Sequence, residues 1–287
     1  MARTGITSQQ LSDHVARLAA EHPPIAMDSV DFTVKRPDVV RDRFATILDY
    51  LARVEHEVDR NVAELQTIMP EPTEEDRAFY ADVWYDQEMQ HGRILDRLKL
   101  ELGLPAADPL LTVGTPLKVL GAMAHLNSIQ DVARTIYYFT GASTERQAVM
   151  AYNALGAAVA DAGETALVET IITPIKRQEP GHFAFYQMSA TKITTDGTLR
   201  PWQLWLAREL RSRTYELVGT HRDPKYKAEM GEVIVRLGFD ADLEDYAREI
   251  GRLEARLLWA SEKGMQFPPY VLKALRESLE LAQTRVA

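Results

Sequence analysis

Two short segments of the chain repeat the same pair of chemically versatile side chains. Glu88 and His91 lie three residues apart, and Glu179 and His182 repeat that spacing later in the chain. Residues three apart share one face of an α-helix, so each pair can present an oxygen and a nitrogen to one point. Carboxylate and imidazole together suit iron or manganese, so the pairs predict a metal site for oxygen chemistry. For either pair alone, the commoner alternative is a surface glutamate beside a half-buried histidine.

Di-iron carboxylate bundles match each Glu-x-x-His helix with another helix that contributes a single inward glutamate. Residues at equal height on two antiparallel helices lie equally far along the chain from the turn between them, because both helices rise equally per residue. The break at residues 70–72 then places Glu55 opposite Glu88. The turn at residues 161–163 likewise places Glu145 opposite Glu179.

The first helix offers Asp59 as a second choice, but Glu55 lies nearer to the apolar stripe of that helix. The predicted metal ligands are therefore Glu55, Glu88, His91, Glu145, Glu179 and His182.

Apolar residues recur every three or four positions through most of the chain, which predicts helices. No segment shows the sustained alternation that a half-buried strand requires, so the predicted class is all-α. We expect a single ferritin-like domain over residues 1–287, with the four-helix bundle at 38–190 and the C-terminal helices, 201–285, packed on it. The expected helices occupy residues 8–21, 38–70, 73–103, 117–159, 164–190, 201–220, 224–236, 241–263 and 268–285.

The composition excludes several classes of site. The chain has 287 residues, 46% of them hydrophobic, and no cysteine, so thiolate metal sites and cysteine nucleophiles are excluded. A formal charge of -9 argues against nucleic-acid binding, which needs a basic surface. No uninterrupted apolar run is long enough for a membrane span, and no secretion signal is evident, so we expect a cytoplasmic protein.

The residues around these pairs resemble the soluble acyl-acyl-carrier-protein desaturases. The second-helix signature of that family is similar to Trp84, Glu88, His91 and Gly92 as they are spaced here. The similarity extends to Thr144-Glu145-Arg146 and to Glu179 and His182 followed by Phe185-Tyr186, and it covers roughly residues 40–190.

This resemblance implies an eleven-helix all-α fold, a homodimer, two irons, dioxygen as oxidant and an external electron donor such as ferredoxin. It further implies that Glu88 and Glu179 bridge the metals and that Glu55 and Glu145 are terminal ligands. The implied reaction attacks an unactivated C–H bond of a fatty acyl substrate, either on acyl carrier protein or on another thioester. Two alternatives remain: a di-iron hydroxylase or N-oxygenase of a small molecule, with a short polar pocket, and a non-catalytic metal-binding bundle.

The chain departs from the family pattern at Pro180-Gly181, between Glu179 and His182. An internal proline removes a helix hydrogen bond at a cost of about 3 kcal/mol, so we expect a kink or bulge there, and Pro174 could add a second bend. Ala148 stands where the desaturases often carry a hydroxyl, so the substrate and the outcome could differ from simple desaturation.

Further residues are candidates for supporting roles. Asp86, Gln87 and Gln178 could orient the imidazoles, although plain surface residues are the commoner alternative. Tyr137, Tyr138 and Phe139 could line a substrate channel or simply belong to the core. A basic concentration could dock an acidic carrier protein or form a solvated mixed-charge face; it comprises Arg208, Arg211, Arg213, Arg222, Lys225 and Lys227. Five histidines stay unassigned: His14, His22, His56, His125 and His221.

Overall fold

The computed structural model describes residues 5–286, with side chains described throughout except at positions 115–117, 119, 120, 127 and 286. Every regular element of these residues is helical, and the described part of the chain contains no strand. The all-α class is therefore confirmed for residues 5–286. Among the described helices, none is both long and apolar enough to cross a bilayer.

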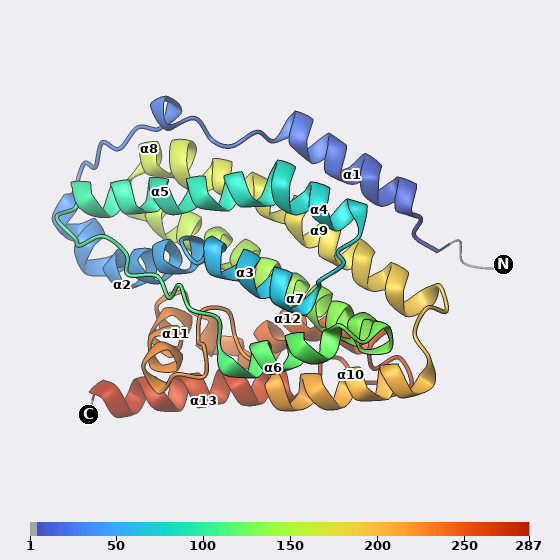
Figure 1. The fold of residues 1–287 in the computed structure, drawn as a ribbon. Coiled ribbons are helices and arrows are strands. Elements are labelled where there is room, and N and C mark those ends of the chain that lie inside the picture. The colour runs from blue at the N-terminus through green and yellow to red at the C-terminus, as the bar shows by residue number, and fades with distance from the viewer. Residues whose placement is uncertain (1–4, 287) are drawn as a thin grey trace.

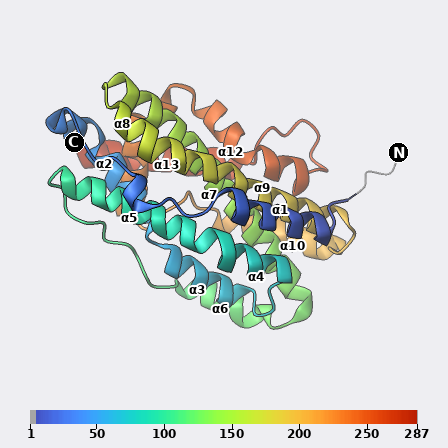
Figure 2. The same cartoon turned by 90° about the horizontal axis from the view of Figure 1, so that it is seen from above.

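Four helices carry the predicted ligands and lie side by side (Figures 1 and 2). They are α2 (Pro37–Glu55), α5 (Tyr85–Glu101), α7 (Asn127–Asp161) and α9 (Thr173–Thr195). The most extensive contacts among them pair α2 with α5 and α7 with α9, as two hairpins would. Their facing stripes share one cluster of buried side chains, in which Ile47, Leu95 and Tyr152 are almost completely buried. Burial of that apolar surface, at roughly 25 cal/mol per Å², is the main force that holds the ligand-bearing helices together.

The helix expected over residues 38–70 is broken in two. After α2 ends at Glu55, a tight turn precedes α3 (Val58–Ile68), and the Glu57 N–H donates to the Val54 carbonyl. Glu57 is 1% exposed and lies against Arg53 and His221. Because a buried carboxylate needs such partners, the chain departs from a continuous helix to place Glu57 among them.

Both helices that carry a Glu-x-x-His pair contain one wide π-helical turn. In the first, α4 (Glu74–Phe79) continues through a π turn, Tyr80–Trp84, into α5. In the second, α8 (Thr165–Leu167) continues through a π turn, Val168–Ile172, into α9.

The bulge expected at Pro180-Gly181 does not occur there, because α9 stays α-helical through both residues. The distortion lies earlier, directly before Pro174, where the Thr173 N–H donates to Val168. An α-helical turn would place the Pro174 ring against the Thr170 carbonyl, and a wider turn relieves that clash.

Helix α1 (Ser8–Glu21) crosses the outside of α4 and α9 (Figure 2). It buries Leu11, Val15 and Leu18 against them. A side chain at Gly181 would place its Cβ 2.5 Å from Leu18, so glycine permits this crossing. The connection after α1 is extended as expected, apart from a short 3-10 turn, Met27–Ser29, and leads along the top of Figure 1 to α2.

The remaining helices cover the side of the bundle opposite to α1 (Figure 1). They are α6 (Thr115–Ala124), α10 (Pro201–Thr214), α11 (Pro224–Arg236), α12 (Leu243–Leu257) and α13 (Pro269–Val286). The helix expected over residues 117–159 is therefore split between α6 and α7 near His125, and Gly141 does not interrupt α7. The helix expected to reach residue 220 ends at Thr214, and an irregular segment, residues 215–223, leads to α11.

Candidate metal centre

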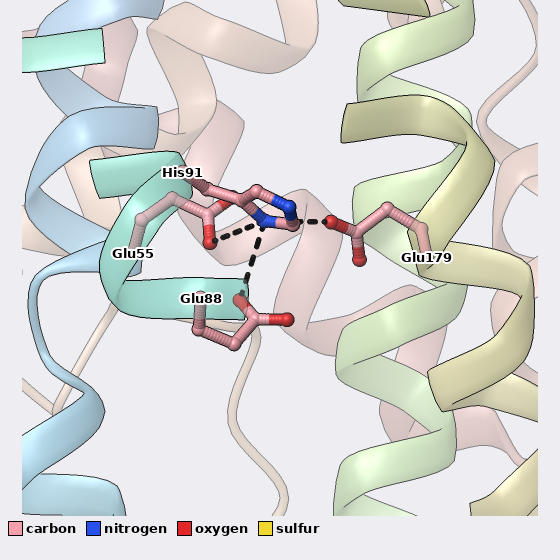
Figure 3. A group of neighbouring side chains, drawn as sticks. All are labelled: Glu55, Glu88, His91 and Glu179. Atoms are coloured by element: carbon pink, nitrogen blue, oxygen red, sulfur yellow. Dashed lines mark ion pairs between the residues drawn. The ribbon is translucent and has the colours of Figure 1, made fainter. Parts of the chain in front are cut away.

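The six predicted ligand side chains lie together in the interior, in two overlapping sets. One set contains Glu55, Glu88, His91 and Glu179, and the other contains Glu88, Glu145, Glu179 and His182. Within each set the candidate ligand atoms all lie within 4.8 Å of one another. Figure 3 shows the first set, with Glu55 from α2 and Glu179 from α9 converging on His91 of α5. Glu88 and Glu179 belong to both sets.

Each imidazole directs its Nδ1 atom at one carboxylate of its own helix and at two from other helices. His91 Nδ1 lies 3.3 Å from Glu179, 3.7 Å from Glu55 and 4.0 Å from Glu88 (Figure 3). His182 Nδ1 lies 2.8 Å from Glu88, 3.5 Å from Glu145 and 3.9 Å from Glu179. The two sets therefore share one arrangement, in which the imidazole Nδ1 atom faces three glutamates.

Four carboxyl groups in one buried place cannot all carry a charge without compensation. Burial, and repulsion from Glu55 and Glu179, raise the pKa of Glu88 well above its usual value. Burial, and repulsion from Glu55 and Glu145, likewise raise the pKa of Glu179 well above its usual value. Burial also opposes the charge of Glu55, but the neighbouring His91 and Glu88 groups lower its pKa to about 2. A cation at this position would let all four groups ionise.

Two glutamines hold the imidazoles in a crossed arrangement. The Oε1 atom of Gln178 on α9 lies 2.6 Å from His91 Nε2, and that of Gln87 on α5 lies 2.8 Å from His182 Nε2. The two amide nitrogens are held by one piece of backbone: Gln87 donates to the His22 carbonyl and Gln178 to the Pro23 carbonyl.

This arrangement determines which imidazole nitrogen carries the proton. Because each amide nitrogen donates to backbone, its oxygen must face the histidine, and only a protonated Nε2 can donate to it. Nδ1 of each ring then keeps a free lone pair directed at the carboxylates. Gln87 and Gln178 are thus buried orienting groups, whereas Asp86, the third candidate, is exposed.

Several buried polar atoms at the centre lack a hydrogen-bond partner among the described residues. They are Nδ1 of both imidazoles and one oxygen each of Glu88 and Glu179. Such atoms are rare in folded proteins because each costs roughly 1–3 kcal/mol. Their types, imidazole nitrogen and carboxylate oxygen, are ligands that iron and manganese accept. The residues present therefore fit a pair of divalent metals, and binding by the six side chains stays a prediction.

Hydrogen bonds hold Glu55 and Glu145, the glutamates that α2 and α7 contribute to the centre. The Tyr152 hydroxyl donates to Glu55, and the Trp84 indole N–H lies 3.2 Å from Glu145 and donates to it. Tyr152 follows Glu145 by two helical turns on the same face of α7, a signal that the sequence contained. The rival Asp59 is exposed and accepts a hydrogen bond from Tyr85, away from the centre.

The five other histidines lie outside the centre. His14 contacts the Gly181 carbonyl, His56 pairs with Asp96, and His221 pairs with Glu57. His22 contributes its backbone carbonyl, as described above, and His125 is exposed.

The basic concentration does not form an uncompensated docking patch. Arg211 is buried against Glu254, and the Arg208 guanidinium donates to the Leu258 carbonyl. The others lie in mixed-charge surroundings: Arg213 pairs with Glu209, Arg222 and Lys227 pair with Glu216, and Lys225 lies over the Tyr226 ring. The solvated mixed-charge alternative therefore describes this region better.

A cavity of about 580 Å³ adjoins the centre, and Glu55, Glu88, Glu145 and Glu179 form part of its wall. Apolar side chains from several helices line much of the rest, among them Leu51, Val54, Val58, Ile68, Val233 and Ile234. The cavity reaches exposed residues, including Thr112, Gly114 and Arg222.

A stripe on α7 shows how far the cavity extends. Tyr137, Gly141, Thr144, Ala148 and Ala151 all line it. At 1.5 Å per residue, that stripe spans roughly 20 Å. Of the three aromatic residues expected to line a channel, only Tyr137 does so. Tyr138 donates to buried Asp76, and Phe139 belongs to the core.

Comparison of the chain with known protein families, with curated proteins and with solved structures found no match. The resemblance to the desaturases therefore rests on the motif residues alone.

Proposed function

We propose that the protein is a dioxygen-dependent di-iron oxidase, with manganese as an alternative metal, that acts on an unactivated C–H bond of a fatty acyl chain. The observation that carries this proposal is the pair of overlapping Glu/His sets, with unpaired ligand atoms, whose four glutamates lie in the wall of a long apolar cavity. We also propose that α2, α5, α7 and α9 form a ferritin-like bundle, because such bundles carry ligands of this kind on four helices.

Bound metals would supply the activation of dioxygen, and six side chains would hold them: Glu55, Glu88, His91, Glu145, Glu179 and His182. The chain's own contribution is to position the ligands and to exclude water. Gln87 and Gln178 keep the Nδ1 atoms of both histidines deprotonated. Trp84 and Tyr152 donate hydrogen bonds that hold Glu145 and Glu55 in place.

The proposed reaction balances with an external electron donor such as ferredoxin. Desaturation removes two hydrogen atoms from adjacent carbons and forms a double bond. Dioxygen accepts those two electrons and protons, with two further electrons from the donor and two protons from solvent, and leaves as two water molecules.

The shape of the cavity favours this reaction over the alternatives. A hydroxylase or N-oxygenase of a small polar molecule calls for a short polar pocket, whereas this cavity follows α7 over roughly 20 Å. A purely structural metal centre needs no adjoining cavity.

Iron binding tests the proposal directly. We expect the full chain to take up two equivalents of Fe(II) without oxygen, and Glu145→Ala or His182→Ala to abolish stoichiometric binding while the helix content stays close to that of the wild type. Titration followed by metal analysis and circular dichroism measures both. Unchanged uptake in both variants rules out the assigned ligands.

A further inference from the structure

The wall of the cavity carries one polar atom that the metal centre does not explain. Gln147 on α7 is 2% exposed, lines the cavity, and has no hydrogen-bond partner for Oε1 among the described residues. Three other cavity-lining side chains have a similarly unpaired atom. Those of Glu88 and Glu179 belong to the metal centre, and Arg60 Nε lies 3.7 Å from a Glu64 oxygen.

The orientation of the Gln147 amide is fixed by its nitrogen. Nε2 donates to the Ser143 carbonyl at 3.1 Å and lies 3.4 Å from the Ser143 hydroxyl. That hydroxyl in turn lies 3.2 Å from the Tyr215 hydroxyl. Reversing the amide would lose the donation to the Ser143 carbonyl and set two acceptor oxygens against each other, so Oε1 stays an acceptor without a donor.

The surroundings make this acceptor selective. On α7, Ala148 and Ala151 line the cavity next to Gln147 and have no side-chain donor, and the Thr144 hydroxyl, one turn earlier, makes no hydrogen bond to Oε1. A buried acceptor without a donor costs roughly 1–3 kcal/mol, and a ligand with an O–H or N–H at this level recovers part of that cost. A ligand without a donor leaves the acceptor unpaired, which is how buried polar groups reject close analogues.

We infer that Gln147 accepts a hydrogen bond from the substrate, and that the site therefore takes a chain-like molecule carrying a hydroxyl or an N–H group along an otherwise apolar length. The inference rests on the proposed function, because it assigns the substrate of that site. Gln147 lies two residues after Glu145, so the hydroxyl or N–H group of the substrate lies about 3 Å further along the axis of α7 than Glu145. A plain hydrocarbon chain binds less tightly.

Binding of matched ligands tests this assignment. The probes are dodecanoic acid and its monohydroxy isomers, titrated against the full chain by displacement of a fluorescent fatty acid. We expect at least one isomer to bind roughly three- to tenfold more tightly than dodecanoic acid, the gain from one neutral hydrogen bond. Gln147→Leu should remove that preference, so that dodecanoic acid and its monohydroxy isomers bind the variant with similar affinity.

A second variant reports whether the ligand occupies this part of the cavity. Ala151 lies one turn after Gln147, so Ala151→Leu should weaken the binding of every isomer and of dodecanoic acid alike. A gain that survives in Gln147→Leu, or equal affinity of the wild type for all the probes, overturns the inference.

Stability and iron binding separate this role from others. A purely structural Gln147 predicts a lower melting temperature for Gln147→Leu, whereas loss of an unpaired acceptor predicts an equal or higher one. Iron uptake by the same proteins tests the oxidase independently. Failed uptake overturns the proposed function, and a missing isomer preference overturns only the role of Gln147.

Discussion

At the scale of single residues, the crossed glutamines couple each half of the centre to the opposite helix. Gln87 precedes Glu88 in sequence but orients His182, and Gln178 precedes Glu179 but orients His91. We expect Gln87→Leu and Gln178→Leu each to weaken Fe(II) binding by about 10–100-fold, because the imidazole loses the acceptor that fixes its tautomer. Competition with a chelator, without oxygen, measures the affinity.

A thermodynamic cycle distinguishes this coupling from a general loss of structure. If Gln87 acts through His182, then in the metal-free protein Gln87→Leu lowers the free energy of unfolding less in a His182→Ala background than in a His91→Ala background. Equal losses in both backgrounds would show that the glutamine acts on the fold as a whole.

The buried carboxyl groups should also make the metal-free protein sensitive to pH. The pKa values of Glu88 and Glu179 are raised well above their usual 4.5 by burial and by repulsion from neighbouring carboxylates. Above about pH 4.5 the folded chain then holds more protons than the unfolded chain, so the free energy of unfolding falls as pH rises. Glu55, with a pKa of about 2, has the opposite effect, and its stabilisation is lost as pH falls from 4.5 toward 2.

Urea unfolding of the metal-free chain across this pH range measures the effect, and Glu179→Gln is the comparison. The difference in unfolding free energy between wild type and variant should shift in favour of the variant as pH rises. A difference independent of pH would contradict a raised pKa for Glu179.

At the scale of helices, Gly141 sets the separation of α7 and α9. A Cβ atom at this position would lie 2.3 Å from the ring of Tyr186, which is 2% exposed and accepts a hydrogen bond from Tyr80. Alanine favours helix over glycine by about 1 kcal/mol, but this clash forces packed side chains apart. We therefore expect Gly141→Ala to lower the free energy of unfolding by roughly 1–3 kcal/mol.

Gly156→Ala on the same helix is the matched control. Its Cβ would lie 3.3 Å from Ile172, a far looser contact, so the helix preference of alanine should dominate. Chemical denaturation of both variants decides the point. Equal stabilisation by the two substitutions would exclude the close approach at Gly141.

The helices also show where prediction from sequence stops. The apolar period of three to four residues located α1, α11 and α13 closely, because that pattern depends on the residues of the helix itself. The break after Glu55 depends on Arg53 and on distant His221, which surround Glu57, and the helix pattern contains no sign of it.

At the centre, the spacing of Glu and His was visible in the sequence, and so was the Gln that precedes each Glu. The crossed pairing of these glutamines was not, because it depends on how α5 faces α9 and on where the backbone at His22 and Pro23 passes. The cavity lies between elements distant in sequence, so local patterns could not predict it.

At the scale of the whole molecule, the proposed metals would join four helices from across the chain. Each of α2, α5, α7 and α9 contributes at least one ligand, so binding is linked to folding of the entire bundle. Metal at 100 times its dissociation constant should raise the free energy of unfolding by about 2.7 kcal/mol, provided that the unfolded chain does not bind it. Denaturation without oxygen, with and without Fe(II), measures this increment.

Two buried carboxylates make a matched pair for this measurement. Glu145 lies in the centre, whereas Glu254 is equally buried but pairs with Arg211 at 2.9 Å, away from it. Glu254→Gln should destabilise the metal-free and metal-loaded proteins equally, because the ion pair is lost in both. Glu145→Gln should reduce the increment from Fe(II), because the set of Glu88, Glu145, Glu179 and His182 loses a ligand. An undiminished increment in Glu145→Gln would mean that iron stabilises the protein from a different place.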